Sequence, residues 1–275
     1  QIKAGTKTCI FGGREVMTQS ERRLFLIKYL FEERKACRAS LPPMNEEEQK
    51  RVLRSLLNIR EPKEPNAEFL RVQDAYLQEE IREKGITDAN TLEPVEDGIY
   101  LWQGDITTLK CGAIVNAANS RLLGCFAPCH LCIDNAIHTF AGVQLRLECN
   151  RIMTEQGYPE PTGKAKLTKA YNLPSEYVLH TVGPIIGGKL TEKDEKELAS
   201  CYTNCLALAA KKGIKSVAFC CISTGEFHFP NETAAHIAIK TVRNFLKANK
   251  DIKVIFNVFL QKDLDIYRRI FGING

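Results

Sequence analysis

The spacing of hydrophobic positions changes along the chain and predicts two regions of different architecture. From Thr18 to about Gly85, hydrophobic residues recur every three or four positions, which is typical of amphipathic helices. Thr18 and Glu21 in the segment TQSE form a capping box, a signal for a helix start. Two further helices are predicted in EEEQKRVLRSLLNIR and AEFLRVQDAYLQEEIREKG, with the prolines of 61–66 between them. Because these helices carry hydrophobic stripes, we expect residues 18–85 to pack on the rest of the protein.

After Pro94, short hydrophobic segments alternate with segments of helical periodicity. Strands are predicted in IYLWQGD, GAIVNAAN, YVLHTVG, SVAFCCIS and DIKVIFNVF. Helices are predicted from Ile133 into LECNRIMTEQG, in EKELASCYTNCLALAAKKG, after a cap at Asn231, and in DLDIYRRIF. Alternating strands and helices predict a three-layer α/β domain. The prediction for the whole chain is therefore a helical extension over 1–94 and an α/β domain over 95–275.

Composition narrows the class of protein. The chain has 275 residues, of which 44% are hydrophobic and 26% charged, as in ordinary globular proteins. No hydrophobic run approaches the roughly 20 residues that span a bilayer, and no secretory signal pattern is present, so no membrane partner is expected. The net charge of +5 is scattered among acidic residues, which argues against a nucleic-acid partner. The eleven cysteines are odd in number and several lie in hydrophobic runs, so a reducing cytoplasm is expected rather than a disulfide framework.

Small and polar residues follow several of the predicted strands. They are Asp105, NAANS at 116–120, HTVGP at 180–184 and STGEF at 223–227. In open α/β sheets, ligands bind beyond the carboxyl ends of the strands. The backbone N–H groups of STGEF, close to the start of a helix, are suited to a phosphate group, although many α/β loops contain Ser and Gly without binding one.

Three cysteines and a histidine crowd into the segment GCFAPCHLCIDNAIH at 124–138. Cys125, His130 and Cys132 supply the three protein ligands that a catalytic zinc takes, with one coordination position left open. Three alternatives stay open on spacing alone: Cys129 replaces one ligand, the loop buries its thiols, or the C-x-x-C pair Cys129 and Cys132 is redox-active. Of the other histidines near the predicted site, His138 and His180 are expected to pack in the core, whereas for His228, in the phosphate loop, a contact with the ligand stays open.

Five motifs occur in an order that resembles one protein family. WQGDIT, AIVNAANSRLLG, DNAIH, YVLHTVGP and ISTGEF resemble the macrodomains, whose members bind ADP-ribose and often cleave it from proteins, and the resemblance covers 98–275. In most macrodomains a glycine-rich run follows NAAN, whereas this chain has GCFAPCHLCIDN. The chain therefore looks like the zinc-dependent branch, which occurs in microbes with a helical N-terminal extension, often together with a sirtuin-type ADP-ribosyltransferase. The fold implied is an α/β/α macrodomain with a mixed central sheet. Gly112 departs from the pattern, since many macrodomains have Asp there.

The resemblance implies roles for the residues around the cysteine-rich segment. It favours Zn²⁺ on Cys125, His130 and Cys132, and it implies that Asp134 and Asn119 lie beside the distal ribose of ADP-ribose. A helix cap for Asp134 and a turn for Asn119 are the alternative structural roles. Asp134 is the candidate to orient or deprotonate the nucleophile. The zinc would bind a ribose hydroxyl or the departing carboxylate, or would lower the pKa of a bound water.

The resemblance also implies contacts for the rest of the ADP-ribose molecule. Asp105 is expected to accept a hydrogen bond from the adenine 6-amino group, and Ile106 to donate its backbone N–H. Phe259, just past the last predicted strand, is expected to stack on adenine. The residues expected to hold the diphosphate are Ser223, Thr224, Gly225, Glu226 and Phe227.

Together these features predict a hydrolase that removes single ADP-ribose groups from a modified protein. The bond broken would join C1″ of the distal ribose to a protein side chain, and its cleavage develops oxocarbenium-like charge on the sugar. The alternative is a non-catalytic ADP-ribose reader, which would use the same pocket but would not need the metal.

Overall fold

Three helices lie in the described residues of the N-terminal part. They are α1 (Gln19–Glu33), α2 (Glu46–Asn58) and α3 (Ala67–Lys84). The capping box of Thr18 and Glu21 is confirmed, and Asn45 and Glu48 form a second one at the start of α2. Helix α3 ends at Gly85, as expected. The computed structural model describes the following residues: 10–11, 14–15, 17–34 and 45–273.

A seven-stranded sheet forms the centre of the α/β domain. Its strands are β4 (Pro94–Glu96), β5 (Ile99–Gln103), β7 (Ala113–Ala117), β8 (Ala165–Lys169), β9 (Tyr177–Thr181), β10 (Ser216–Phe219) and β11 (Lys253–Val258). The order across the sheet is β4-β5-β11-β10-β7-β9-β8. The five central strands run parallel, and β4 and β8 pair antiparallel with their neighbours at the two edges. The mixed sheet implied by the sequence is therefore confirmed.

Among the residues that the structure describes, four short strands lie outside this sheet. They are β1 (Ile10–Phe11), β2 (Arg14–Glu15), β3 (Thr87–Asp88) and β6 (Leu109–Lys110). Strand β1 pairs antiparallel with β2, and β3 pairs in parallel with β6. The second pair joins the end of the helical part to the segment that follows β5.

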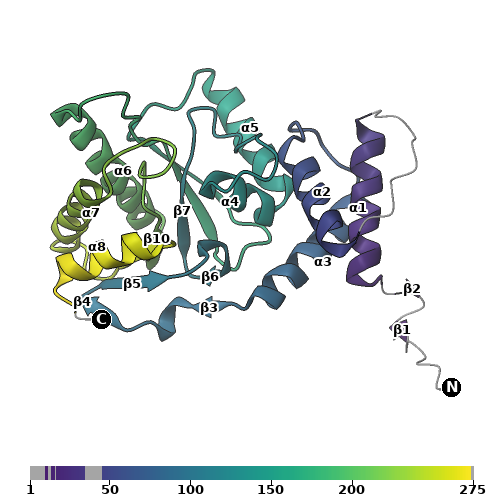
Figure 1. Ribbon diagram of the computed structural model, residues 1–275, viewed down its shortest axis with the longest axis horizontal. Helices are drawn as coiled ribbons and strands as arrows, with labels where there is room; N and C mark the ends of the chain where they lie inside the picture. The colour runs from purple at the N-terminus through teal and green to yellow at the C-terminus, as the bar shows by residue number, and fades with distance from the viewer. Residues whose placement is uncertain (1–9, 12–13, 16, 35–44, 274–275) are drawn as a thin grey trace.

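Helices cover both faces of the central sheet (Figure 1). One layer contains α4 (Ile133–Ala141) and α5 (Val143–Gln156), and the other contains α6 (Glu192–Lys211), α7 (Asn231–Leu246) and α8 (Gln261–Phe271). Between the layers, strand residues such as Val115, Val217 and Val254 are fully buried. Burial on both faces is typical of parallel strands. The predicted three-layer architecture is therefore confirmed.

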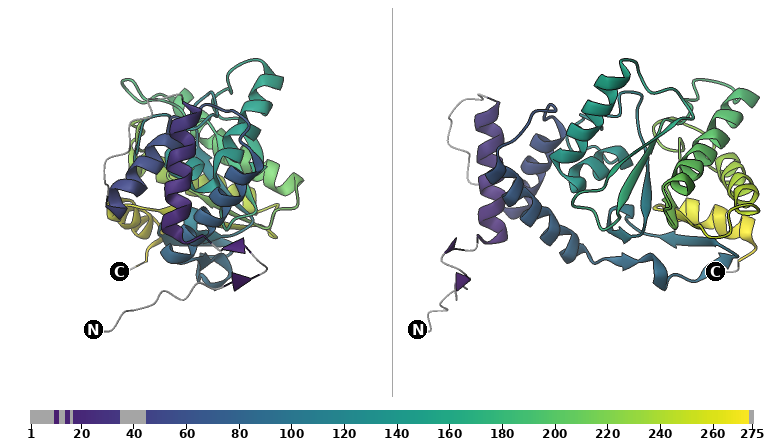
Figure 2. Two further views of the ribbon diagram at one scale, coloured as in Figure 1. Left: turned by 90° about the vertical axis from the view of Figure 1, so that its right-hand side faces the viewer. Right: turned by 180° about the vertical axis from the view of Figure 1, so that it is seen from behind.

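The N-terminal helices pack against the α4 and α5 side of the domain (Figure 2). Their hydrophobic faces form a second core, in which Leu26, Leu53 and Phe69 are buried together with Val143 of α5. Phe140 of α4 contacts both hydrophobic cores. The expectation that the helical stripes pack on the rest of the protein is therefore confirmed for the described helices.

Two predicted features of the helices are wrong. The helix predicted to continue into LECNRIMTEQG is broken into α4 and α5 at Gly142, where φ is +92°. This positive φ favours glycine, and a Cβ here would also lie 2.7 Å from the amide ends of the Gln73 and Gln144 side chains, which would have to shift. Asn231 is the first residue of α7 and does not cap it; its side chain donates to Asp263 at 2.6 Å instead.

Two expectations from composition bear on the described part of the chain. None of the helices there is long and apolar enough to cross a bilayer. The cysteines described are free thiols, several of them in the core. Burial raises the pKa of the Cys220 thiol to about 12, for example, so such thiols behave as small hydrophobic side chains.

Candidate functional site

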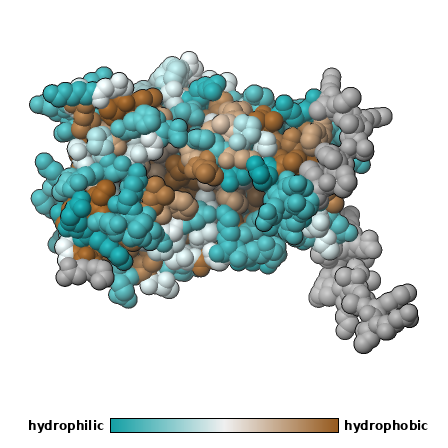
Figure 3. Space-filling model, in the orientation of Figure 1, coloured by the Kyte–Doolittle hydropathy of each residue, from teal (hydrophilic) through white to brown (hydrophobic). Residues whose placement is uncertain are grey.

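The five parallel strands end at one edge of the sheet, and the loops that follow them carry the predicted site residues. Asn119 follows β7, the segment 223–227 follows β10, and Phe259 follows β11. The face of the molecule drawn in Figure 3 is hollowed near its centre, and hydrophobic residues gather around the hollow. A crevice beyond strand ends is the usual ligand position in open α/β sheets.

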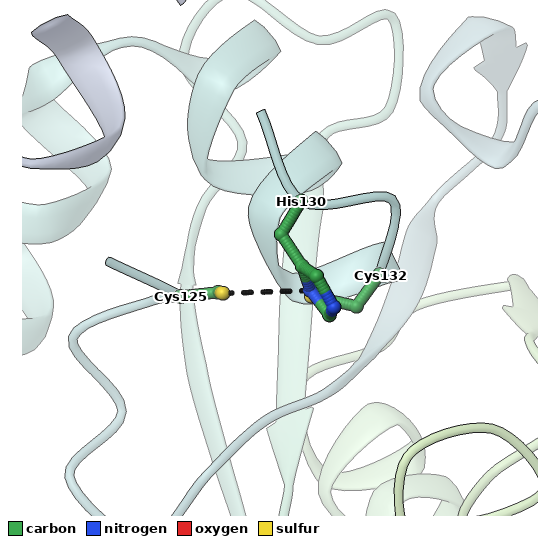
Figure 4. A group of neighbouring side chains, drawn as sticks. All are labelled: Cys125, His130 and Cys132. Carbon is green, nitrogen blue, oxygen red and sulfur yellow. Dashed lines mark hydrogen bonds between the residues drawn. The ribbon is translucent and has the colours of Figure 1, made fainter. Parts of the chain in front are cut away.

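The loop between β7 and α4 brings the predicted metal ligands together. Within its segment 125–132, which we call the metal loop, a donor atom from each of Cys125, His130 and Cys132 lies within 4.8 Å of the others (Figure 4). The Sγ atom of Cys125 is 3.7 Å from Nδ1 of His130. Two such donors bound to one tetrahedral zinc, at bond lengths of about 2.3 and 2.0 Å, lie about 3.5 Å apart. Both the donor types and this separation therefore fit zinc.

The remaining cysteine of the metal loop lies outside this group. The thiol of Cys129 donates to the backbone carbonyl of Arg51 in α2 at 3.3 Å. Cys132 is the N-cap of α4, and its Sγ accepts the N–H of Asn135 at 3.4 Å. Burial raises the pKa of the Cys132 thiol to about 12. These contacts favour a metal site over a redox site, with Cys129 excluded from the ligand group.

Asp134 lies in the first turn of α4, two residues after Cys132, and is buried. Its two carboxylate oxygens accept hydrogen bonds from Nδ2 of Asn116 at 2.8 Å and Nδ2 of Asn119 at 3.2 Å. Burial raises the pKa of Asp134 to about 6, although the hydrogen bond from Asn116 and the charge of Arg146 act in the opposite direction. The N-cap of α4 is Cys132, so Asp134 does not cap this helix. Its carboxylate is held instead by the side-chain amides of Asn116 and Asn119.

Asn119 also shapes the loop after β7. Its Oδ1 accepts the backbone N–H of Arg121 at 3.0 Å, and its Nδ2 donates to the carbonyl of Gly124 at 3.1 Å. The turn role predicted for this residue is therefore present. The same amide reaches Asp134, so one side chain connects the turn to the carboxylate at the start of α4.

A second group of possible metal ligands lies in the core next to α4. His138, Cys149 and His180 are buried, with donor atoms within 4.8 Å of one another. The ring nitrogens of His180 lie 3.2 Å from Nδ2 of Asn116 and 2.9 Å from Oγ1 of Thr168, so both have protein partners. Burial lowers the pKa of both histidines, that of His180 to about 3, so the rings are neutral. The expectation that His138 and His180 pack in the core is confirmed.

The loop after β10 leaves several backbone N–H groups available to a ligand. Among the described residues, none accepts a hydrogen bond from the N–H of Gly225, Glu226 or Phe227. The loop is closed by the N–H of Phe229, which donates to the carbonyl of Ser223 at 2.9 Å, and Ser223 has a φ of +64°. Free amides close to the start of α7 are suited to an anion such as a diphosphate.

The side chain of Glu226 turns from this loop toward the metal loop. Its Oε1 lies 3.6 Å from Nε2 of His130, whose Nδ1 faces Cys125. Metal-binding histidines usually donate their second ring N–H to such a carboxylate, which fixes the orientation of the ring. At 3.6 Å the approach is longer than a hydrogen bond, and it brings the side chain of Glu226 beside the metal loop while its backbone N–H stays free. His228, whose role the sequence left open, is exposed and its ring bonds to no other described residue.

The residues predicted for adenine gather where β5 and β11 end. One oxygen of Asp105 accepts the N–H and the hydroxyl of Thr107 at 3.0 and 2.6 Å, and the other lies 3.0 Å from Nζ of Lys84. Burial tends to raise the pKa of Asp105, but the bonds from Thr107 and the charge of Lys84 outweigh it and hold the pKa below its ordinary value. Ile106 begins a 3-10 turn, where backbone N–H groups lack helical partners. Phe259 is 70% exposed, so its ring is open to stacking.

Sequence reasoning missed two side chains of this site, Asn116 and Lys84, and it assigned Glu226 to the diphosphate without its contact to His130. Asn116 is a polar residue inside a hydrophobic strand, and a buried amide needs a partner, so its position was a usable signal. Lys84 comes from α3 and meets Asp105 across 21 positions of the chain. Glu226 meets His130 across a still longer separation. No local pattern announces either of the last two contacts.

Several known proteins are similar to this chain in sequence. A family model described as Macro domain matches residues 115–238. The chain is 57% identical over 261 residues to a protein-ADP-ribose hydrolase of Treponema medium, covering 93% of this chain and 100% of that protein. It is 47% identical over 262 residues to a protein-ADP-ribose hydrolase of Staphylococcus aureus (strain MSSA476), covering 94% of this chain and 98% of that one. The chain belongs to the macrodomain family.

Solved macrodomain structures share the fold. The macrodomain of Trypanosoma brucei in complex with ADP-ribose is 30% identical, with a TM-score of 0.61 over 79% of this chain and 95% of that one. The macrodomain of Oceanobacillus iheyensis with ADP is 35% identical, with a TM-score of 0.60 over 66% of this chain and 94% of that one. The departure from the macrodomain pattern at Gly112 has a local reason, because a Cβ there would lie 2.9 Å from the carbonyl oxygen of Ser216.

Proposed function

We propose that this macrodomain is a zinc-dependent hydrolase that releases single ADP-ribose groups from modified proteins. One observation carries the proposal: three zinc-type donors lie in a loop that runs directly into a buried carboxylate held by two amides. A module that only binds ADP-ribose has no need of this arrangement. The hydrolase names of the two bacterial relatives support the same conclusion.

The proposed ligand extends along the carboxyl edge of the sheet. Adenine would lie at Phe259 and Asp105, and the diphosphate would accept hydrogen bonds from the free amides of 225–227. The distal ribose would then lie near Asn119 and Asp134. Three positions support this direction. The exposed ring of Phe259 follows β11, the free N–H groups of 225–227 follow β10, and the carboxylate of Asp134 lies beyond the end of β7, where it contacts Asn119.

Cys125, His130 and Cys132 would hold the zinc ion, with Glu226 orienting the ring of His130. When bound at such a site, zinc supplies a Lewis acid that withdraws electron density from an oxygen atom. The protein's part is to bring the two thiols and the imidazole together in a loop that is fixed at both ends by β7 and α4.

Asp134 would contribute to the reaction in two ways. Cleavage at C1″ develops positive charge on the ribose, and a fixed carboxylate stabilises such charge most where water is excluded. The same carboxylate would orient the attacking water and accept its proton. Asn116 and Asn119 each donate to one oxygen, so the carboxylate is held in one orientation before substrate binds.

Turnover distinguishes the hydrolase from a reader. The zinc-loaded protein, present at a small fraction of the concentration of a mono-ADP-ribosylated protein, is expected to release free ADP-ribose in many-fold excess over itself. The amount released is measured by chromatography, and the modification left on the protein by mass spectrometry. Tight ADP-ribose binding with no release from Asp-, Glu- or other side-chain linkages would instead support the reader.

The adenine contact makes a separate prediction about affinity. Asp105→Ala should weaken ADP-ribose binding by about 1–3 kcal/mol, because the adenine amino group would lose its acceptor. Titration calorimetry measures the change. Asp88→Ala is a matched control, since Asp88, like Asp105, caps a 3-10 turn and pairs with a lysine, Lys110, at 3.1 Å. Equal affinities for the two folded variants would remove Asp105 from the adenine site.

A further inference from the structure

The last residue of α2 is bonded to the metal loop. Asn58 is buried, and its Oδ1 accepts the backbone N–H of Cys129 at 2.9 Å. Its Nδ2 donates to Oγ1 of Thr139 in α4 at 2.9 Å. Cys129 has a φ of +54°, a conformation that residues other than glycine seldom adopt. Asn58 therefore fixes the metal loop at a residue with a constrained backbone.

One turn earlier on α2, Arg54 spans the metal loop and the start of α4. Its Nη2 donates to the carbonyl of His130 at 3.0 Å and to Oδ1 of Asn135 at 2.9 Å. Asn135 is fully buried and donates in turn to the carbonyl of Ala127 at 3.0 Å. The guanidinium thus holds the backbone of one metal ligand directly and an earlier part of the loop through Asn135.

The end of α2 is itself anchored to the α/β domain. Arg146 of α5 is buried and donates to the backbone carbonyls of Leu57 and Asn58 at 3.1 and 2.9 Å, and also to that of Arg60. A cation at this position satisfies carbonyls that have no partner inside the helix and interacts favourably with the helix dipole. The position of Arg54 and Asn58 relative to the metal loop is therefore defined by the domain as well as by the helix.

We propose that α2 is a functional part of the metal site. In this proposal, which rests on the proposed zinc-dependent function, Arg54 and Asn58 hold the metal loop so that its three donors converge before zinc binds. Both side chains contact the loop and not its donor atoms, so they are positioning residues. Because a loop that is already ordered loses less conformational freedom on binding, the two contacts raise zinc affinity. Contacts of this outer kind typically change metal affinity by about 10- to 100-fold.

Zinc affinity of the full chain tests the proposal with two variants and a matched control. The variants are Arg54→Ala and Asn58→Ala. The control is Arg51→Ala on the same helix, because the side chain of Arg51 is exposed and bonds to no other described residue. Zinc dissociation constants are measured by competition with a chromophoric chelator. Melting temperatures without metal and the affinity for adenosine diphosphate are measured on the same samples.

Arg54→Ala and Asn58→Ala are expected to weaken zinc binding by about 10- to 100-fold, while Arg51→Ala matches the wild type. Affinity for adenosine diphosphate should stay the same in all three. Arg54 is only half-buried, so its variant provides the test if Asn58→Ala does not fold. A folded Arg54→Ala protein that melts at a lower temperature but binds zinc as tightly as the wild type would overturn the proposal.

The same measurements distinguish a failure of the role proposed for α2 from a failure of the proposed hydrolase function. A wild-type protein that binds zinc and shows the expected effect of Arg54→Ala, yet releases no ADP-ribose, would contradict the function and support the role of α2. A wild-type protein that hydrolyses its substrate with zinc, and whose zinc affinity is insensitive to Arg54 and Asn58, would support the function and contradict the role of α2.

Discussion

The Cys132→Ala variant is expected to lose its zinc and at least about a hundredfold of its hydrolysis rate. The change leaves two donors, Cys125 and His130, where three converge in the wild type. A Lewis acid stabilises transition-state charge by several kcal/mol, and each 1.4 kcal/mol corresponds to a tenfold change in rate. Binding of adenosine diphosphate should persist, because Asp105, Phe259 and the amides of 225–227 are untouched. Metal content, hydrolysis rate and this affinity are measured on one preparation.

Cys129→Ala is the matched control for this variant. Cys129 lies in the same loop, three residues earlier, and its thiol faces the carbonyl of Arg51 instead of the ligand group. The control should keep both zinc and activity. If the two alanine variants lose zinc equally, the effect reports a general disturbance of the loop and not the loss of a ligand. If Cys132→Ala loses zinc and keeps the wild-type rate, zinc has no part in the chemistry.

The Asp134→Ala variant is expected to keep its zinc and still lose about a hundredfold or more of the rate. A positioned general base typically contributes about 10²- to 10⁴-fold. The three donors of the metal loop stay in place, and Cys132 continues to cap α4 because its Sγ accepts a backbone N–H. The hydrolysis rate of the zinc-loaded variant under saturating substrate is the deciding quantity.

Removal of this carboxylate also takes one acceptor from each of the amides of Asn116 and Asn119, so thermal stability is measured beside the rate. The activity is compared at a temperature where both proteins are fully folded. A folded, zinc-loaded Asp134→Ala protein with a rate within a few-fold of the wild type would assign the proton transfer to another group or to none.

Much of the fold follows from local features of the sequence. The capping box at Thr18 and the hydrophobic periodicity of the three N-terminal helices predicted those helices correctly. The central strands were found because each is a short hydrophobic run between turn residues. The edge strand β8 was missed, since AKLTK carries two lysines and an edge strand needs only one hydrophobic face. The break at Gly142 was also missed, because a single glycine within a helical pattern does not by itself end a helix.

The candidate site was predictable where its residues are close in sequence or match a recognisable motif. Cys125, His130, Cys132 and Asp134 lie within ten residues, and the structure brings them together around the start of α4. The contacts that orient them come from distant parts of the chain. Arg54 reaches the loop across 76 positions. Such contacts depend on how α2 docks on the domain, and docking is decided by packing that no local pattern encodes.

Reversible removal of the metal tests the central claim most directly. Zinc is stripped from the wild-type protein with a strong chelator, the chelator is removed, and release of ADP-ribose from a mono-ADP-ribosylated protein is followed before and after zinc is returned. The account predicts that the stripped protein binds adenosine diphosphate but releases no ADP-ribose, and that one equivalent of zinc restores the rate. Release at the wild-type rate by protein shown to contain no metal would contradict it.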